Sequence, residues 1–152
     1  MLNLRNTDAI LEVRKLVLGE KLWEEKGKAI GMSIKSIGPE GVHMEQTFTS
    51  TVKGFGRNPN GTNMGTLDLV QAADGSSSGS GQGIFTSQDG DSVAWKFYFL
   101  GKMEEGKSRA VGIIKFMTAS QKLAWMNKTI ATLEGISDTK TMEMSATGYE
   151  WK

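Results

Sequence analysis

The chain has 152 residues, of which 38% are hydrophobic, and its formal net charge is +1. This length suits a single domain spanning residues 1–152, and without a basic stripe we expect no nucleic-acid partner. The sequence has no cysteine, which excludes disulfides, thiolate metal sites and thiol nucleophiles. Its 19 glycines and 2 prolines are typical of a protein built from strands and tight turns.

The N-terminal segment predicts a short helix. Residues 7–18 (TDAILEVRKLVL) place apolar side chains near helical spacing, Thr7 or Asp8 can cap the start, and Gly19 can end it. A strand is the alternative, because β-branched residues are frequent in this segment. Charges interrupt the apolar stretch, so we expect neither a signal peptide nor a membrane span, and we expect a cytoplasmic protein.

From residue 28 onward, apolar and polar residues alternate as in strands. A first strand is expected over residues 28–37 and a second over residues 42–56, with a Gly-Pro-Glu-Gly turn between them. Asn60-Gly61 and Asp89-Gly90 are hairpin signals. Further strands are predicted over residues 62–73, 80–88, 92–102, 108–118, 129–136 and 141–151. Residues 119–127 break the alternation, and we expect one helical turn near residues 120–126, capped by Ser120.

Two glycine-containing motifs resemble nucleotide loops but have the wrong context. The cluster GSGQG at residues 79–83 lacks the third glycine of a dinucleotide loop, because Ile84 stands in its place. The stretch GKMEEGKS at residues 101–108 fits the spacing of a phosphate-binding loop. A strand pattern follows it, however, where such a loop needs a helix N-terminus. We interpret both as parts of β-hairpins.

About eight strands without helical crossovers predict an antiparallel sheet. Closing the sheet into a barrel removes its two unpaired edges, and eight strands enclose a lumen that holds side chains or one small ligand. The expected fold is therefore mainly β, a closed antiparallel barrel of about eight strands, with a two-sheet sandwich as the alternative.

The chemistry-bearing residues are few. His43 is the only histidine, and it shares a strand face with Glu45. A solvated strand face is the simpler interpretation, and the two would be an acid–base pair only if that face lined a lumen. We expect no metal site, no cofactor and no catalytic residues. Candidate ligand-binding residues are the aromatic side chains expected in the core, Phe48, Trp95, Phe97, Phe116 and Trp125.

Four segments resemble a family of small uncharacterised prokaryotic proteins. They are NMGT at residues 63–66, GSGQGIFTSQDGDSVAW at 79–95, FMTASQKLAWMN at 116–127 and YEWK at 149–152. The resemblance covers residues 26–152. That family is similar in architecture to allene-oxide-cyclase-like barrels of the calycin (lipocalin-like) type. The resemblance implies a barrel, and it implies no catalytic residues.

Three functions fit these sequence patterns. The first is a barrel that binds a small apolar ligand in its lumen, and the second is a cyclase- or isomerase-like enzyme acting on a lipophilic substrate. The third is a protein–protein interaction module or oligomeric scaffold. Residues 93–100 are apolar on both faces, so we expect a homo-oligomer with Tyr98 and Leu100 in its interface.

Overall fold

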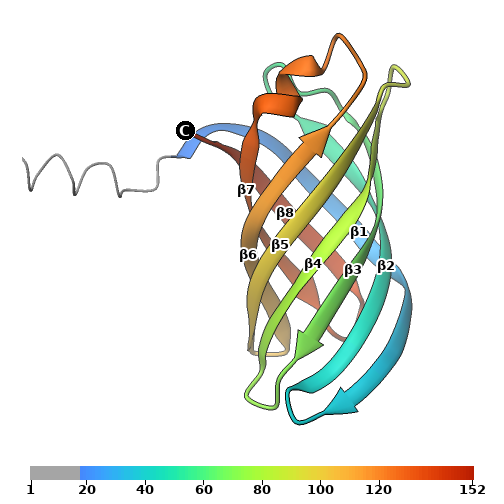
Figure 1. Cartoon of the computed structure of the whole chain (residues 1–152), viewed down its shortest axis with the longest axis vertical. Helices are drawn as coiled ribbons and strands as arrows, with labels where there is room; N and C mark the ends of the chain where they lie inside the picture. The colour runs from blue at the N-terminus through green and yellow to red at the C-terminus, as the bar shows by residue number, and fades with distance from the viewer. Residues whose placement is uncertain (1–17) are drawn as a thin grey trace, which may run out of the picture.

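The chain from residue 18 to residue 152 forms eight strands and one short 3-10 helix in the computed structural model, which describes these residues (Figure 1). The elements are β1 (Leu18–Gly38), β2 (Gly41–Gly54), β3 (Gly61–Gln71), β4 (Ser76–Ser87), β5 (Ser92–Glu104), β6 (Lys107–Met117), η1 (Ala124–Lys128), β7 (Ile130–Asp138) and β8 (Glu143–Trp151).

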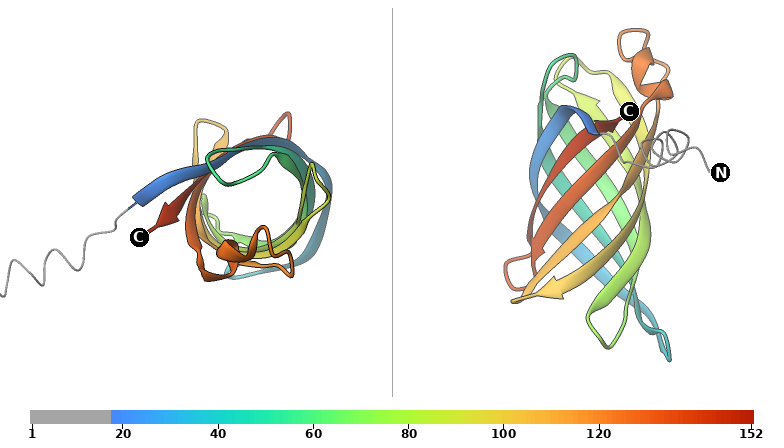
Figure 2. Two further views of the ribbon diagram at one scale, coloured as in Figure 1. Left: turned by 90° about the horizontal axis from the view of Figure 1, so that it is seen from above. Right: turned by 90° about the vertical axis from the view of Figure 1, so that its left-hand side faces the viewer.

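The sheet closes on itself. Each strand pairs antiparallel with its neighbours in sequence, and β1 pairs with β8, so all eight strands have two partners. Figure 2 shows the closed ring from one end. The predicted eight-stranded antiparallel barrel is thus confirmed, and both edges of the sheet are paired with each other from Leu18 to Lys28 of β1. The connection that carries η1 lies at one end of the barrel, and the β1–β2, β3–β4, β5–β6 and β7–β8 turns lie at the other (Figure 1).

Several predicted boundaries need correction. The predicted helix over residues 7–18 lies outside the described residues except for Leu18, which is the first residue of β1. The helical turn expected near residues 120–126 lies slightly later, at Ala124–Lys128, and is a 3-10 helix. Ser120 still contacts the segment that leads into this helix, since its Oγ accepts a hydrogen bond of 3.3 Å from the backbone N–H of Leu123.

Strand β1 begins ten residues before the predicted strand and includes Trp23 and Glu25. The pairing register with β8 shifts twice between Leu18 and Trp23, which brings Leu22 and Trp23 into the interior as neighbours in sequence. Two adjacent buried residues break the alternation on which the prediction relied. Beyond Lys28, β1 pairs with β2 alone, and this hairpin projects past the barrel wall (Figure 2).

Strand β5 shows how alternation builds the core. Val93, Trp95, Phe97 and Phe99 are buried, whereas Tyr98 and Leu100 are exposed on the outer face. Aromatic pairs then connect strands across the interior: the Phe48 and Trp95 ring centroids lie 6.0 Å apart, and those of Trp23 and Phe116 also lie 6.0 Å apart. Their large buried areas make these rings the main hydrophobic contribution to the core.

Glycines make room for the two interior indoles. The ring of Trp95 lies across β4 and β3, where a Cβ on Gly83 would overlap the ring and a Cβ on Gly65 would lie 2.6 Å from its Cζ2. A Cβ on Gly148 would overlap Trp23 in the same way. The glycine-rich segment of β4 therefore leaves the space that the Trp95 ring occupies, so its glycines serve packing.

A Gly83→Ala substitution tests whether Trp95 needs this space. We expect it to lower the free energy of unfolding by about 1–3 kcal/mol, because the added methyl group overpacks the core against Trp95 and the β3 backbone. Urea denaturation followed by circular dichroism measures the change. Gly31→Ala is the matched control, since no atom lies within 4 Å of its Cβ position. Equal stability of the two variants would contradict this packing role of Gly83.

Candidate functional site

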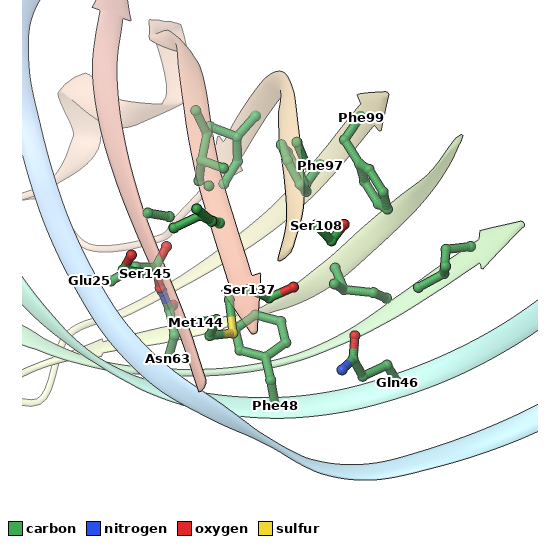
Figure 3. A pocket seen from close by; sticks show the side chains of 18 of the residues that line it. Glu25, Gln46, Phe48, Asn63, Phe97, Phe99, Ser108, Ser137, Met144 and Ser145 are labelled. Carbon is green, nitrogen blue, oxygen red and sulfur yellow. The ribbon is translucent and has the colours of Figure 1, made fainter. Parts of the chain in front are cut away.

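The barrel encloses a cavity of about 350 Å³, a size in the range of small-molecule sites. Side chains from all eight strands and from η1 line it. The apolar lining is rich in aromatic and methionine side chains, among them Phe48, Phe97, Phe99 and Met144 (Figure 3). The polar side chains at the wall include Glu25, Asn63, Gln46 and four serines, Ser77, Ser108, Ser137 and Ser145.

The η1 end of the cavity is closed by packed side chains. Leu123 and Met126, from the β6–β7 connection, are 1% and 3% exposed and belong to the hydrophobic core. Leu22 and Val93 complete the buried layer at this end. A closed end with this packing excludes water and leaves access to the opposite end.

The opposite end is the mouth of the cavity. Met32 lines the cavity and is 50% exposed, so the cavity reaches solvent beside it. Asp138 and Thr139, at the β7–β8 turn, also belong to the lining. Backbone N–H groups of Thr141 and Lys140 donate to the Asp138 carboxylate, and these hydrogen bonds hold its pKa below the ordinary value.

A buried carboxylate lies in the cavity wall. Glu25 is 6% exposed, and its Oε1 accepts a hydrogen bond of 3.2 Å from the indole N–H of Trp23. Its Oε2 accepts from the Ser50 hydroxyl at 2.6 Å and from the Asn63 amide at 3.1 Å. These three donors come from β1, β2 and β3, so the carboxylate joins neighbouring strands at one point of the lumen.

The orientation of the Asn63 amide follows from its partners. The indole N–H of Trp95 donates to Asn63 Oδ1 at 3.1 Å, and an indole N–H can only donate. Asn63 therefore turns its oxygen toward Trp95 and its NH2 group toward Glu25. The result is a continuous chain of hydrogen bonds from one indole to the other, in which only donors face the carboxylate.

One buried acceptor has no partner. Asn58 is 7% exposed and lines the cavity, and its NH2 group donates to the backbone oxygen of Leu22 at 2.8 Å. Its Oδ1 is buried and has no hydrogen-bond partner among the described residues. Leaving a buried acceptor unpaired costs about 1–3 kcal/mol, so this atom is a feature that needs an explanation.

Four of the five predicted ligand-binding residues line the cavity: Phe48, Trp95, Phe97 and Phe116. Trp125 does not, and we correct its placement. It precedes Met126 on η1 and lies partly buried beneath the Arg57 guanidinium, 4.0 Å from the ring centroid.

His43 and Glu45 lie on the outer face of the barrel, so they do not form an acid–base pair in the lumen. The His43 ring nitrogen Nε2 is hydrogen-bonded to Asp68, and Glu45 Oε2 lies 3.6 Å from the Lys35 Nζ. No group of three or more metal-ligating side chains occurs within residues 18–152. Residues 101–108, which fit a phosphate-loop pattern, end β5, turn, and begin β6 as a hairpin.

Sequence reasoning missed the polar half of the site. Glu25, Ser50, Asn63 and Asn58 were not predicted, because polar and charged residues are ordinarily assigned to the exposed surface. One usable signal was present. Ser50 has the same parity as the predicted core residues Phe48 and Val52, which places its hydroxyl in the interior.

Comparison with known proteins reveals the fold. No family model and no curated protein matches the chain. A protein of unknown function from Clostridium acetobutylicum is similar, with a TM-score of 0.78 and 14% identity over 91% of this chain and 99% of that one. A β-barrel-like protein from Acinetobacter baumannii is similar with a TM-score of 0.75 and 15% identity, over 91% of this chain and 97% of that one. An enzyme from Penicillium herquei is similar with a TM-score of 0.62 and 19% identity, over 89% of this chain and 95% of that one. At these identities the likeness shows a common barrel fold.

A Ser50→Ala substitution tests the polar network. We expect it to lower the free energy of unfolding by about 1–3 kcal/mol, because the buried Glu25 carboxylate loses one of its three donors. Chemical denaturation measures the loss. The control is Ser78→Ala on the exposed face of β4, which should change stability by less than about 0.5 kcal/mol. Similar small changes in both variants would show that the network contributes nothing to stability.

Proposed function

We propose that the protein binds a small, largely apolar molecule in the lumen of the barrel. The observation that carries the proposal is the cavity of about 350 Å³, closed at the η1 end, open beside Met32 and lined mainly by apolar side chains. Apolar walls with a few placed polar groups are the usual composition of a ligand site. No helix among the described residues is both long and apolar enough to cross a membrane. We also propose that the protein acts in the cytoplasm.

A cyclase- or isomerase-like activity is the second candidate, and Glu25 is the observation that favours it. A carboxylate held by three donors in an apolar lumen is suited to acid–base chemistry or to stabilising positive charge on a substrate. The proposed kinship with allene-oxide-cyclase-like calycin barrels and the likeness to the Penicillium herquei enzyme support this candidate. Turnover of a bound lipophile separates it from simple binding.

Blocking the lumen tests the binding proposal. The wild-type protein should bind medium-chain alcohols and amines, which quench or shift the fluorescence of Trp23 and Trp95 and raise the melting temperature. Ser108→Phe places a ring in the cavity and should weaken this binding at least about tenfold. Ser78→Phe adds the same ring on the outer face and should leave binding unchanged. Equal binding by both variants would contradict a lumenal site.

Self-association remains a prediction. Tyr98 pairs with Ile113 and Leu100 with Val111 across β5 and β6, and all four side chains are more than half exposed. We expect this apolar patch to bury itself against a second copy of the chain. Light scattering at high micromolar concentration should give a mass above that of one chain, and Leu100→Lys should lower it. A monomeric mass for the wild-type protein would reject the prediction.

A further inference from the structure

The charged side chains of the cavity wall all have the same sign. Among residues 18–152, Glu25 and Asp138 are the charged residues of the lining, and no lysine, arginine or histidine belongs to it. Glu25 lies within the wall and Asp138 lies at the mouth. Lys107 and Lys140 interact with Asp138 at the mouth, so the Glu25 charge decides the sign inside. Apolar walls strengthen the field of this charge, so the cavity favours a positively charged ligand over a negatively charged one.

The Glu25 carboxylate has acceptor capacity to spare. A carboxylate offers roughly four lone-pair sites. Ser50 and Asn63 donate to Oε2, while Trp23 alone donates to Oε1. Within residues 18–152, one site on Oε1 therefore has no donor. None of the ion pairs of the described chain includes Glu25, although a buried carboxylate is strongly stabilised by a cation.

Asn58 gives an independent indication of the same chemistry. Its Oδ1 is a buried acceptor without a partner in the lining of the same cavity. The Leu22 carbonyl fixes the amide, since only the NH2 group can donate to it. The polar atoms left unsatisfied at the wall are thus acceptors, and the groups that complement them are hydrogen-bond donors.

The rings around Glu25 suit a cation as well. The hydrogen-bonded chain that holds the carboxylate ends on the indoles of Trp23 and Trp95, and both indoles line the cavity. Indole faces attract ammonium groups through the ring quadrupole. Because Glu25, Trp23 and Trp95 line one cavity, an ammonium group in it can combine ion pairing with cation–π attraction.

We propose that the ligand of this barrel is a cationic amphiphile, an alkyl- or arylammonium compound whose head donates to Glu25. Its apolar body lies against the aromatic and methionine side chains of the lumen, including Phe48, Phe97 and Met144. This inference rests on the proposed lumenal binding and names its ligand class. Carboxylate lipids such as fatty acids should bind most weakly, because their heads meet the Glu25 carboxylate.

Three probes with the same alkyl chain and different heads test the inference: octylammonium, 1-octanol and octanoate. An alkylammonium head, like that of lysine, is charged at neutral pH. Titration calorimetry on the full chain should give octylammonium an affinity at least about tenfold higher than that of octanol, and octanoate the lowest affinity. Glu25→Gln should remove the preference for octylammonium while octanol still binds. Glu20→Gln, an exposed carboxylate on the same strand, should preserve the preference.

The outcomes separate the two proposals. If octanol or octanoate binds as tightly as octylammonium, the cationic ligand class is wrong and lumenal binding stands. If octylammonium keeps its preference in Glu25→Gln, the head does not pair with Glu25 and the inference is overturned. If none of the three probes binds to the wild-type protein, lumenal binding itself fails and the inference fails with it.

A measurement on the wild-type protein covers the case in which Glu25→Gln does not fold. The carboxyl carbon resonance of Glu25 should shift on addition of octylammonium and shift much less with octanol. Equal shifts with the two probes would overturn the pairing.

Discussion

An antiparallel sheet that closes on itself sends every second side chain of a regular strand into one enclosed space. All eight strands of this protein have two partners, and apart from β1 beyond Lys28, which pairs with β2 alone, the strand pairing satisfies the backbone hydrogen bonds of the wall. Side-chain volume then decides which parts of the interior are filled and which stay open. Where large rings meet, as in Trp23 with Phe116, the lumen is filled, and where smaller side chains such as Ser108 and Ser137 face inward, it stays open.

The polar network places a charge-bearing group in this interior without disrupting it. Glu25, Ser50 and Asn63 lie on three consecutive strands, so the register of β1 with β2 and of β2 with β3 fixes their spacing. Asn63 and Trp95 add a further link through β3 to β5. The group that gives the cavity its chemical preference is therefore held by the same strand pairing that closes the barrel.

Sequence patterns predicted the barrel well and the site in part. Alternation on β2 and β5 placed Phe48, Trp95 and Phe97 inside, because each strand keeps a strict two-residue period there. The first half of β1 was missed, since two register shifts bury Leu22 and Trp23 side by side. Glu25 lies in this part of β1 and was therefore not predicted either. Trp125 was placed in the lumen because its side chain is aromatic, whereas the 3-10 helix turns it toward Arg57.

The closed η1 end gives the lumen a direction. Leu123 and Met126 seal it, so a molecule that enters beside Met32 travels toward a dead end and keeps its trailing part nearest to water. Its leading group must match the wall closely, whereas its tail is limited only by the depth of the lumen. Across a homologous series, each methylene that fits inside adds roughly 0.8 kcal/mol of binding free energy, and the gain ends once the chain reaches the rim.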